Sequence, residues 1–240
     1  MVTCNLFGRY ANNLWQVSAT IAYALKHKMP YVIPEHGLNY GQNTNYKFPN
    51  QKNILINIPN GIYTQPNHGY NEIPYFENVR LNGHFQSEKY FEGFRDEIRT
   101  ELGFPEATIN KCAVHVRRGD YLKQQNNFPV LPFDYYDKAV GIITKEMKVG
   151  IKKFVFFSDD IEWCKNTFGA VMTEYYKTND DIADLKHMAE YKYMIIANSS
   201  YSLFASLINE KECVIAPKLW FGKDIKLKTD DLLPERFIKI

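Results

Sequence analysis

The 240-residue sequence contains few cysteines and no long apolar run. Its cysteines, Cys4, Cys112, Cys164 and Cys213, lie far apart, without the spacing of a zinc site or the density of a disulfide-stabilised domain. The most apolar stretches, such as residues 154–157, are far too short to span a bilayer, and the N-terminus lacks the basic and apolar regions of a signal peptide. We therefore expect a reduced, soluble and cytoplasmic protein with no transmembrane segment.

An excess of charge of either sign is also missing. The chain has 29 Lys and Arg residues against 27 Asp and Glu residues, a net charge of +2. This balance is too even for a protein held mainly by nucleic-acid phosphates, so we expect no nucleic-acid partner. Hydrophobic residues make up 45% of the chain and charged residues 23%, which is ordinary for a globular protein and excludes wholesale disorder. The aromatic fraction of 15% can line a sugar or base site, although aromatic residues more often fill a core.

In the C-terminal half, short apolar runs alternate with helical patterns. Strands are predicted at residues 111–116, 154–157, 171–175, 193–197 and 213–216, and helices at 133–146, 161–168, 181–192 and 201–209. Regular alternation of this kind predicts a doubly wound parallel sheet. Polar clusters follow three of the strands, at residues 117–120, 158–160 and 198–200. Because such sheets bind ligands at the carboxyl ends of their strands, these clusters predict a binding site.

The N-terminal half is less regular. Strands are predicted at residues 2–7, 31–33 and 53–58, helices at 14–27 and 87–102, a glycine-led loop at 8–13, and long surface loops at 37–50 and 59–74. A boundary near residues 108–111 would divide the chain into an N-terminal domain, 1–108, and a C-terminal Rossmann-like domain, 109–240. We therefore predict an α/β protein with two domains.

The sharpest motif is HVRRGD, at residues 115–120, directly after a predicted buried strand. Adjacent arginines at a strand end can hold a phosphate or pyrophosphate through paired N–H donors. Because side chains alternate along a strand, His115 and Arg117 should point to one side and Arg118 to the other. One arginine can then face a ligand while the other braces the loop, for example onto Asp120. The alternative interpretation is a surface salt bridge.

The other two clusters in this half allow more than one interpretation. Asp159 or Asp160 can cap the following helix or contact a ligand; a metal site, or the aspartate pair of a phosphatase, is less favoured because no other dense acidic cluster lies nearby. Residues 198–200 can cap a helix at Ser200 or donate to phosphate oxygens. Asp184, in the preceding helix, is interpreted as a solvated side chain.

The loop at residues 8–13 is a weaker anion-binding signal. Backbone N–H groups at the start of a helix attract anions, but one glycine is not a phosphate-binding fingerprint, and the chain has neither G-x-G-x-x-G nor G-K-[ST]. By itself, the loop is more simply interpreted as a turn.

Several segments together resemble the α-1,2-fucosyltransferases of glycosyltransferase family 11. In chain order they are GRYANNLWQ, LNGHFQSEKYF, HVRRGDY, FFSDDIEWCK, DLKHMAEYKYMIIANSSYSLFASLI and VIAPKLWF. The H-x-R-R-x-D motif within them is specific to the wider fucosyltransferase superfamily. The resemblance implies a GT-B-like fold of two Rossmann-type domains facing a cleft, with the N-terminal domain on the acceptor side. It also implies GDP-β-L-fucose as donor, a glycan acceptor, inversion to an α-linked product and no metal cofactor.

The resemblance also implies roles for individual residues. Arg117 would hold the β-phosphate with Arg118 in support, His115 would lie near the guanine or ribose, and Asp184 would meet the guanine edge. The full set of donor-binding residues implied in this way is Gly8, Asn12, His115, Arg117, Arg118, Asp159, Asp160, Asp184, Asn198, Ser199 and Ser200. The catalytic residue implied is Arg117. A general base should also take the proton of the acceptor hydroxyl, and Asp120, which we include among the catalytic residues, Glu35 and Glu72 are the carboxylates that could do so.

The sequence departs from the family pattern at Ala11, Asn13 and Trp15. We therefore keep two alternatives beside a fucosyltransferase: the same fold acting on another GDP-sugar, and a non-catalytic module that binds a nucleotide or a glycan.

Overall fold

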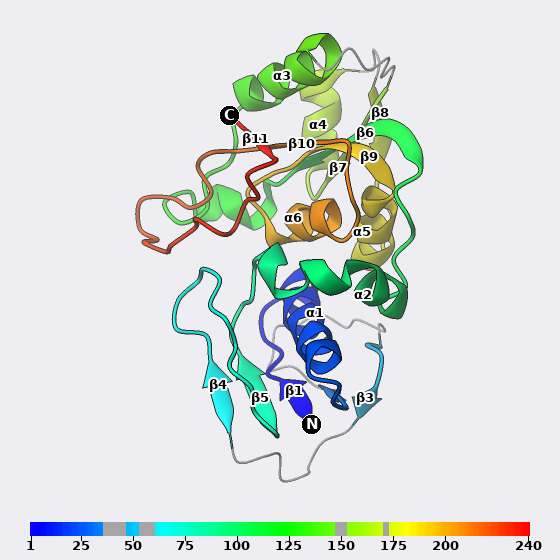
Figure 1. The fold of residues 1–240 in the computed structure, drawn as a ribbon. Helices are drawn as coiled ribbons and strands as arrows, with labels where there is room; N and C mark the ends of the chain where they lie inside the picture. The colour runs from blue at the N-terminus through cyan, green and yellow to red at the C-terminus, as the bar shows by residue number, and fades with distance from the viewer. Residues whose placement is uncertain (36–46, 53–60, 147–152, 170–172) are drawn as a thin grey trace. The chain divides into compact units, whose positions relative to one another are not determined.

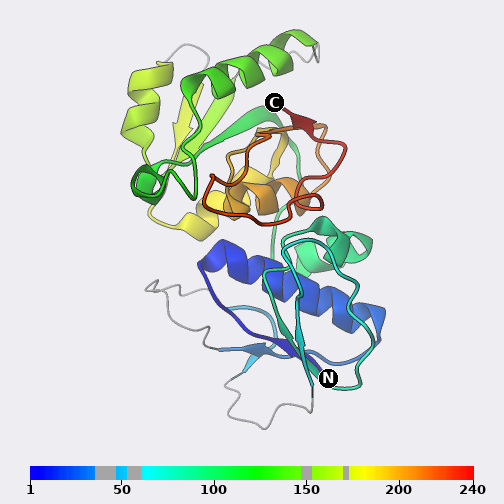
Figure 2. The ribbon, with the colours of Figure 1, turned by 90° about the vertical axis from the view of Figure 1, so that its left-hand side faces the viewer.

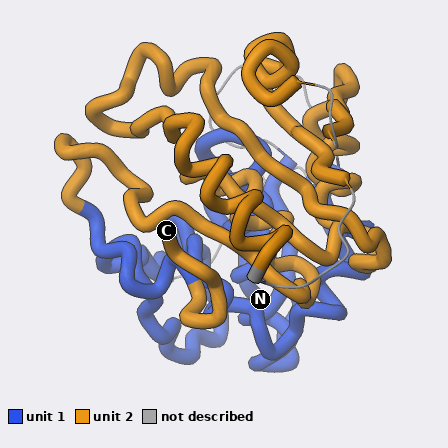
Figure 3. The backbone as a smooth tube through the Cα atoms, turned by 90° about the horizontal axis from the view of Figure 1, so that it is seen from above, with its two compact units in different colours: residues 1–104, 227–233 blue, residues 105–226, 234–240 orange. Residues whose placement is uncertain are grey.

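The fold is taken from a computed structural model, and residues 1–35, 47–52, 61–146, 153–169 and 173–240 are described. The chain forms two compact units (Figure 3). Unit 1 consists of residues 1–104 and 227–233, and unit 2 of residues 105–226 and 234–240. The predicted boundary fell between residues 108 and 109 and gave the whole C-terminal segment to one domain, whereas the chain returns to unit 1 near its end.

Unit 2 contains a six-stranded sheet in which every neighbouring pair of strands is parallel (Figure 1). Its order is β11-β10-β9-β6-β7-β8. The strands are β6 (Ile109–Val116), β7 (Phe154–Ser158), β8 (Thr173–Tyr176), β9 (Tyr191–Ile195), β10 (Cys213–Ala216) and β11 (Ile238–Lys239). The predicted α/β class and parallel sheet are confirmed. The central strands are buried because they are covered on both faces, which is why they read as continuous apolar runs.

Helices α3 (Phe133–Gly141) and α4 (Ile161–Phe168) cover one face of this sheet (Figure 2). A single buried cluster contains alternate residues of β6, such as Val114 and Val116, together with Tyr136 of α3 and Cys164 of α4. Residues 142–146 continue α3 as a wider, π-type turn.

Helices α5 (Asp181–Ala189) and α6 (Ser200–Leu207) contact the opposite side chains of the strands. The ring of Phe157 lies 5.8 Å from that of His187 on α5, and the ring of His115 lies 5.4 Å from that of Tyr201 on α6. Neighbouring side chains of β6 therefore point to opposite faces of the sheet. Val114 and Val116 face α3 and α4, and His115 faces the side of α5 and α6.

Unit 1 has a parallel sheet of order β1-β5-β4, beside which helix α1 (Tyr10–Lys26) packs (Figure 1). The strands are β1 (Val2–Cys4), β4 (Ile62–Thr64) and β5 (Val79–Asn82), and a second parallel pair is formed by β2 (Ile33–Pro34) and β3 (Gln51–Lys52). Tyr31, the predicted start of a strand, forms an isolated bridge to Val2. The apolar stripe of α1 is buried against the sheet, and Trp15 is completely enclosed.

Three predictions for unit 1 were wrong. The helix predicted at 14–27 begins at Tyr10, so Asn12 and Asn13 are helical and the turn is confined to Gly8. The helix predicted at 87–102 is broken into two 3₁₀ turns and a short helix, because the backbone is not helical at Phe91 and Phe94. The loop predicted at 59–74 contains β4, and β5 was not predicted. The interrupted segment consists of η1 (Glu88–Tyr90), η2 (Glu92–Phe94) and α2 (Arg95–Glu101).

The strand predicted at 53–58 lies outside the described residues, as does most of the loop predicted at 37–50. In unit 2, α5 ends at Ala189, and Tyr191 already belongs to β9, so the predicted helix at 181–192 was too long.

The four cysteines, all described, are buried free thiols. Within the described ranges, no helix combines the length and apolar character needed to cross a bilayer.

Candidate functional site

The strand order of unit 2 defines where a ligand would bind. The chain runs from β6 through β7 to β8 on one side of β6 and then crosses to β9 and β10 on the other side. Doubly wound sheets bind ligands at such a reversal, outside the carboxyl ends of the strands. Ile195 at the end of β9 pairs with Val114 of β6, and Ser158 at the end of β7 pairs with Val116. The three predicted polar clusters therefore follow neighbouring strands at one edge of the sheet.

Arg117 is the first residue after β6 and is held by two carboxylates. Its Nη1 atom lies 2.9 Å from Oδ2 of Asp159, its Nη2 atom pairs with Asp120, and its guanidinium carbon lies 5.2 Å from the ring centre of Tyr121. The side chain is 19% exposed. The fixed fork of the guanidinium is thus oriented from both sides while part of it faces solvent.

Arg118 points to the other face of the sheet, as the alternation along the strand predicts. Its guanidinium lies 3.9 Å from the ring centre of Trp163 on α4, and its Nε atom lies 3.0 Å from Oδ2 of Asp160. The prediction that the bracing arginine acts through Asp120 needs a correction, because Asp120 pairs with Arg117, while Arg118 pairs with Asp160. Arg118 instead anchors the motif to α4.

Asp159 clamps the motif loop. Its Oδ1 atom accepts a hydrogen bond of 2.9 Å from the backbone N–H of Arg118, while its Oδ2 atom pairs with Arg117. Gly119 leaves room for this carboxylate, because a Cβ at that position would collide with Oδ2 of Asp159. The two arginines and three aspartates of residues 117–120 and 159–160 therefore form one cluster, which we call the motif cluster.

Asp160, rather than Asp159, caps α4. Its Oδ1 atom accepts from the backbone N–H of Trp163 at 3.2 Å, and its own backbone N–H donates to Oγ of Ser158 at 2.9 Å. In the described part of the chain, no three His, Cys, Asp or Glu side chains are grouped as metal ligands would be. Helix capping, one of the roles that the sequence allowed, is therefore the role of Asp160, whereas Asp159 bonds to Arg117 and Arg118.

His115 is buried beside the motif cluster. Its side chain is packed against Tyr201, and its Nδ1 atom has no hydrogen-bond partner among the described residues. Burial, together with the nearby charge of Arg117, lowers the pKa of His115 to about 3. The imidazole is therefore neutral at physiological pH and presents a hydrogen-bonding ring, not a cation.

Asp184 is not the solvated side chain that the simple interpretation predicted, because it is only 7% exposed. Its carboxylate accepts hydrogen bonds from the backbone N–H of Thr178, at 3.0 Å, and from the hydroxyl of Thr178, at 2.7 Å. Thr178 lies just after β8, so Asp184 fastens α5 to that end of the sheet. Any contact of Asp184 with a nucleobase would be made in addition to these bonds.

Asn198 joins three loops. Its Nδ2 atom donates to the backbone carbonyls of Pro129 and Trp220 at 3.0 and 3.1 Å, and its backbone carbonyl accepts from the hydroxyl of Tyr121 at 3.0 Å. Ser199, not Ser200, caps α6 by accepting from the backbone N–H of Tyr201. Asn198 therefore holds the loop architecture around the start of α6.

In unit 1, Gly8 and Asn12 lie together at the start of α1. Gly8 has a φ of +77°, and a Cβ there would collide with Nδ2 of Asn12. Oδ1 of Asn12 accepts from Nε2 of Gln86 at 2.9 Å. Gln16, which is fully buried, accepts from the backbone N–H of Phe7 at 3.2 Å and fixes the turn.

Sequence reasoning missed three residues at the edge of the unit 2 sheet. Tyr121 and Trp163 stand within the recognised motifs, but only their three-dimensional positions show that each stacks on an arginine. Lys177 follows β8, and its Nζ atom lies 3.5 Å from the backbone carbonyl of Asp159. Its position two residues after the strand predicted at 171–175 was the signal that could have found it.

The other two carboxylates that could act as general base, Glu35 and Glu72, do not belong to unit 2. Glu72 pairs with Lys26 at 3.2 Å, and Glu35 is exposed. Both belong to unit 1. The carboxylate of Asp120 is engaged by Arg117.

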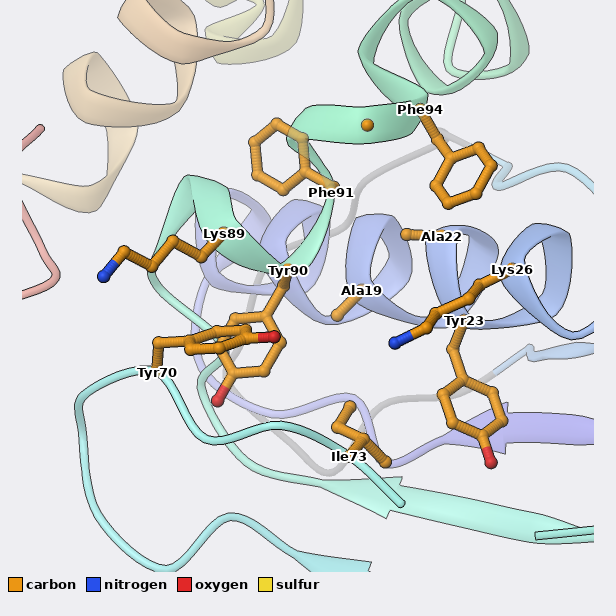
Figure 4. A pocket seen from close by; sticks show the side chains of 11 residues that line it. Ala19, Ala22, Tyr23, Lys26, Tyr70, Ile73, Lys89, Tyr90, Phe91 and Phe94 are labelled. Carbon is orange, nitrogen blue, oxygen red and sulfur yellow. The ribbon is translucent and has the colours of Figure 1, made fainter. Parts of the chain in front are cut away.

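Unit 1 also has a small pocket of about 110 Å³ between α1 and the segment of η1 and η2 (Figure 4). Its walls are aromatic and aliphatic side chains, with Lys26 and Lys89 at its rim. Both lysines are already paired, Lys26 with Glu72 and Lys89 with Asp231. None of the predicted site residues lines this pocket, so the charged edge of unit 2 remains the principal candidate site.

Comparison with known families and curated proteins gives consistent matches. The profile of Glycosyl transferase family 11 matches residues 1–236. The O-antigen biosynthesis glycosyltransferase WbnK of Escherichia coli is 32% identical over 175 residues, which are 62% of this chain and 57% of that protein. An alpha-1,2-colitosyltransferase of Escherichia coli is 28% identical over 184 residues, 68% of this chain and 62% of that protein. The chain thus spans between 57% and 62% of the length of these curated relatives.

Two solved structures were also aligned with the chain. A crystal structure of POFUT1 in complex with GDP-fucose has a TM-score of 0.48 at 12% identity, over 86% of this chain and 93% of that chain. A crystal structure of POFUT1 in complex with GDP has a TM-score of 0.45 at 11% identity, over 99% of this chain and 97% of that chain.

Proposed function

Because the chain belongs to glycosyl transferase family 11, we propose that it is an inverting glycosyltransferase that moves L-fucose from GDP-β-L-fucose to a glycan hydroxyl. The proposed acceptor atom is O2 of galactose, and the proposed product is an α-1,2 linkage. The activity needs no metal cofactor in this proposal.

One observation carries the proposal: at the strand reversal of the unit 2 sheet, a guanidinium group is connected through one tyrosine to the segment that leads into a helix N-terminus. Tyr121 stacks on Arg117, and its hydroxyl donates to the carbonyl of Asn198, which leads into α6. Guanidinium donors and the positive end of a helix both attract phosphate oxygens. The edge therefore suits the diphosphate of a nucleotide sugar.

The chemistry of transfer uses this arrangement. Breaking the bond between C1 of fucose and its phosphate oxygen leaves negative charge on the departing GDP. Donors that are already oriented stabilise this charge more in the transition state than in the ground state. Asp120 and Asp159 orient Arg117 in this way, and a guanidinium has five N–H donors, more than these two ion pairs require.

The remaining site residues have proposed roles at the donor. Neutral His115 and buried Asp184 are proposed to contact the nucleoside, Ser199 and Ser200 the diphosphate, and Asn12 the fucose. Asp160, Arg118 and the Nδ2 atom of Asn198 are proposed to hold the loops that carry these contacts, because these groups bond to other parts of the protein. The Oδ1 atom of Asn198 is buried and has no hydrogen-bond partner among the described residues.

The ion pairs of the motif cluster are also what the salt-bridge alternative predicts, so binding must be measured. The experiment compares the thermal stability of the protein with GDP, GDP-fucose, GDP-mannose and UDP, and then assays GDP release with galactose-terminated oligosaccharides. We expect stabilisation by GDP and GDP-fucose but not by UDP, and acceptor-dependent release of GDP. Binding of GDP without release by any acceptor would instead indicate a non-catalytic module.

A second donor is favoured by one similarity, namely that to the alpha-1,2-colitosyltransferase. In this alternative the same site transfers colitose from a GDP-linked donor. Including GDP-colitose in the assay separates the two, because the preferred donor will have the higher kcat/KM.

A further inference from the structure

The ring of Tyr121 lies against the guanidinium of Arg117. The guanidinium carbon is 5.2 Å from the ring centre, within the range of an attractive cation–π contact. Asp120 and Asp159 bond to the two Nη atoms of Arg117, whose N–H groups point within the guanidinium plane. Bonds within the plane resist tilting only weakly, whereas a ring over its face opposes tilting directly. Tyr121 therefore adds the contact that fixes the orientation of the plane.

The hydroxyl of Tyr121 connects the same side chain to the start of α6. It donates a hydrogen bond of 3.0 Å to the backbone carbonyl of Asn198. Asn198 directly precedes Ser199, the N-cap of α6, whose side chain accepts from the backbone N–H of Tyr201. Guanidinium groups and helix N-termini both attract phosphate oxygens. One tyrosine thus contacts the guanidinium and the residue that leads into the helix.

Arg117 also lies near the first turn of α6. The ring of His115, two residues before Arg117, is 5.4 Å from the ring of Tyr201 in that turn. Burial and nearby aspartates raise the pKa of Tyr201, and the charge of Arg117 opposes this rise. Tyr121 therefore connects two groups that are close enough to act on one small anion.

Two loops hold the Tyr121 ring in place. The ring stacks on that of Phe128, with 5.1 Å between the ring centres, and the ring of Phe128 lies 6.0 Å from that of Phe221. The backbone N–H of Gly222 donates to the carbonyl of Asn127 at 2.8 Å, which joins the two loops. All of these residues belong to unit 2, so the arrangement lies within one unit.

We propose that Tyr121 is a positioning residue, which holds the guanidinium of Arg117 at a fixed spacing from the start of α6 so that both bind one diphosphate. This inference rests on the proposed function and adds to it the residue that favours a nucleoside diphosphate over a monophosphate. GDP carries on its terminal phosphate the charge that develops when the bond to fucose breaks, and GMP lacks that phosphate. The spacing therefore strengthens GDP binding and accelerates transfer, but does not affect GMP.

The experiment compares the full chain with Tyr121→Phe, which removes the hydroxyl and keeps the ring. Loss of one hydrogen bond should raise the Kd for GDP by about 2–10-fold and lower kcat by a similar factor, while the Kd for GMP stays unchanged. Tyr121→Leu, which also removes the ring, should raise the Kd for GDP by about 5–50-fold. Isothermal titration calorimetry measures the affinities, and acceptor-dependent release of GDP measures kcat.

Two comparisons separate positioning from a general loss of stability. Tyr175→Phe is the matched control, because the hydroxyl of Tyr175 on β8 also donates to a backbone carbonyl of unit 2, that of Cys164 at 3.3 Å. This variant should bind GDP and transfer normally. In an Arg117→Ala background, Tyr121→Phe should raise the Kd for GDP no further, because the guanidinium that Tyr121 positions is gone.

The outcomes that overturn the proposal are distinct from those that overturn the function. An unchanged Kd for GDP in Tyr121→Phe, an equal rise for GDP and GMP, or an additive effect in the Arg117→Ala background overturns the positioning role and leaves the donor assignment intact. If Tyr121→Phe does not fold, Phe128→Leu, which withdraws the stacked ring, must weaken GDP binding without weakening GMP binding. Absence of GDP binding by the unsubstituted protein overturns the proposed function itself.

Discussion

Gly119 and Asp159 lie in direct contact, so that the carboxylate of Asp159 occupies the space that a side chain at position 119 would need. This close approach lets one carboxylate bind both the guanidinium of Arg117 and the backbone of Arg118. The shape of the HVRRGD loop thus depends on Asp159, which lies 41 positions after Arg118 in the sequence.

Gly119→Ala should therefore displace Asp159 and loosen the loop. We expect the free energy of unfolding to fall by about 1–3 kcal/mol, the usual cost of adding a methyl group to a packed site. Urea denaturation measures it. Gly141→Ala is the matched control, because outside the adjoining backbone of its own helix nothing lies within 4 Å of a Cβ there, and alanine favours the helix. Equal stability of the two variants would contradict the close contact between Asp159 and the loop at Gly119.

Arg117→Ala should abolish transfer while leaving the fold intact. Loss of one oriented donor to a developing anion costs about 10²–10³-fold in kcat, and the side chain is partly exposed, so its ion pairs contribute little to stability. GDP release and circular dichroism measure the two properties. Arg236→Ala, an exposed arginine of the same unit, is the control and should remain active. Near-normal turnover in folded Arg117→Ala would exclude the proposed role.

Arg118→Ala should act mainly on stability. The change removes the contact with the Trp163 ring and the ion pair with Asp160, each worth up to about 1 kcal/mol at a partly exposed site. A double-mutant cycle with Trp163→Leu measures the first of these. We expect a coupling energy of about 0.5–1 kcal/mol between the two positions, and a coupling of zero would show that the stacking contributes nothing.

Transfer should not depend on a divalent cation. The oxygens of Asp159 and Asp160 accept hydrogen bonds or ion pairs from Arg117, Arg118 and Trp163, which leaves them poorly placed to coordinate a cation. Activity should therefore be the same before and after treatment with EDTA. Loss of activity that Mg²⁺ restores would favour the alternative of an aspartate-based, metal-dependent enzyme.

Stability should rise with pH above neutrality because of Lys211. Burial lowers the pKa of Lys211 to about 7, and its ammonium donates to the carbonyls of Ala189 and Tyr191. Between pH 7 and the ordinary lysine value, the unfolded chain binds a proton that the folded chain does not. The free energy of unfolding therefore increases with pH, by at most about 1.4 kcal/mol per pH unit.

Urea denaturation between pH 7 and the onset of thiol ionisation tests this slope. Lys211→Met should remove it, whereas Lys218→Met, at an exposed lysine of the same unit, should retain it. Identical slopes in both variants would show that Lys211 does not titrate in this range.

Much of unit 2 could be predicted from its sequence. The strand predicted at 213–216 has the same bounds in the structure, and those at 111–116 and 154–157 differ from β6 and β7 only at their ends. Strands covered on both faces are continuous apolar runs bounded by turn residues, and such runs are a local signal. Unit 1 was harder because β4 and β5 are short and partly polar, so their patterns resemble loops.

The sequence by itself determined that polar residues follow the buried strands of unit 2, and the resemblance carried by those residues identified the family. Only the tertiary structure decided which partners they meet: Asp159 with Arg117, Asp160 with Arg118, and Gln86 with Asn12. The physical reason is that periodicity and turn chemistry act between neighbours along the chain. Ion pairs and amide contacts instead depend on distances of about 3 Å between segments that only the folded sheets bring together.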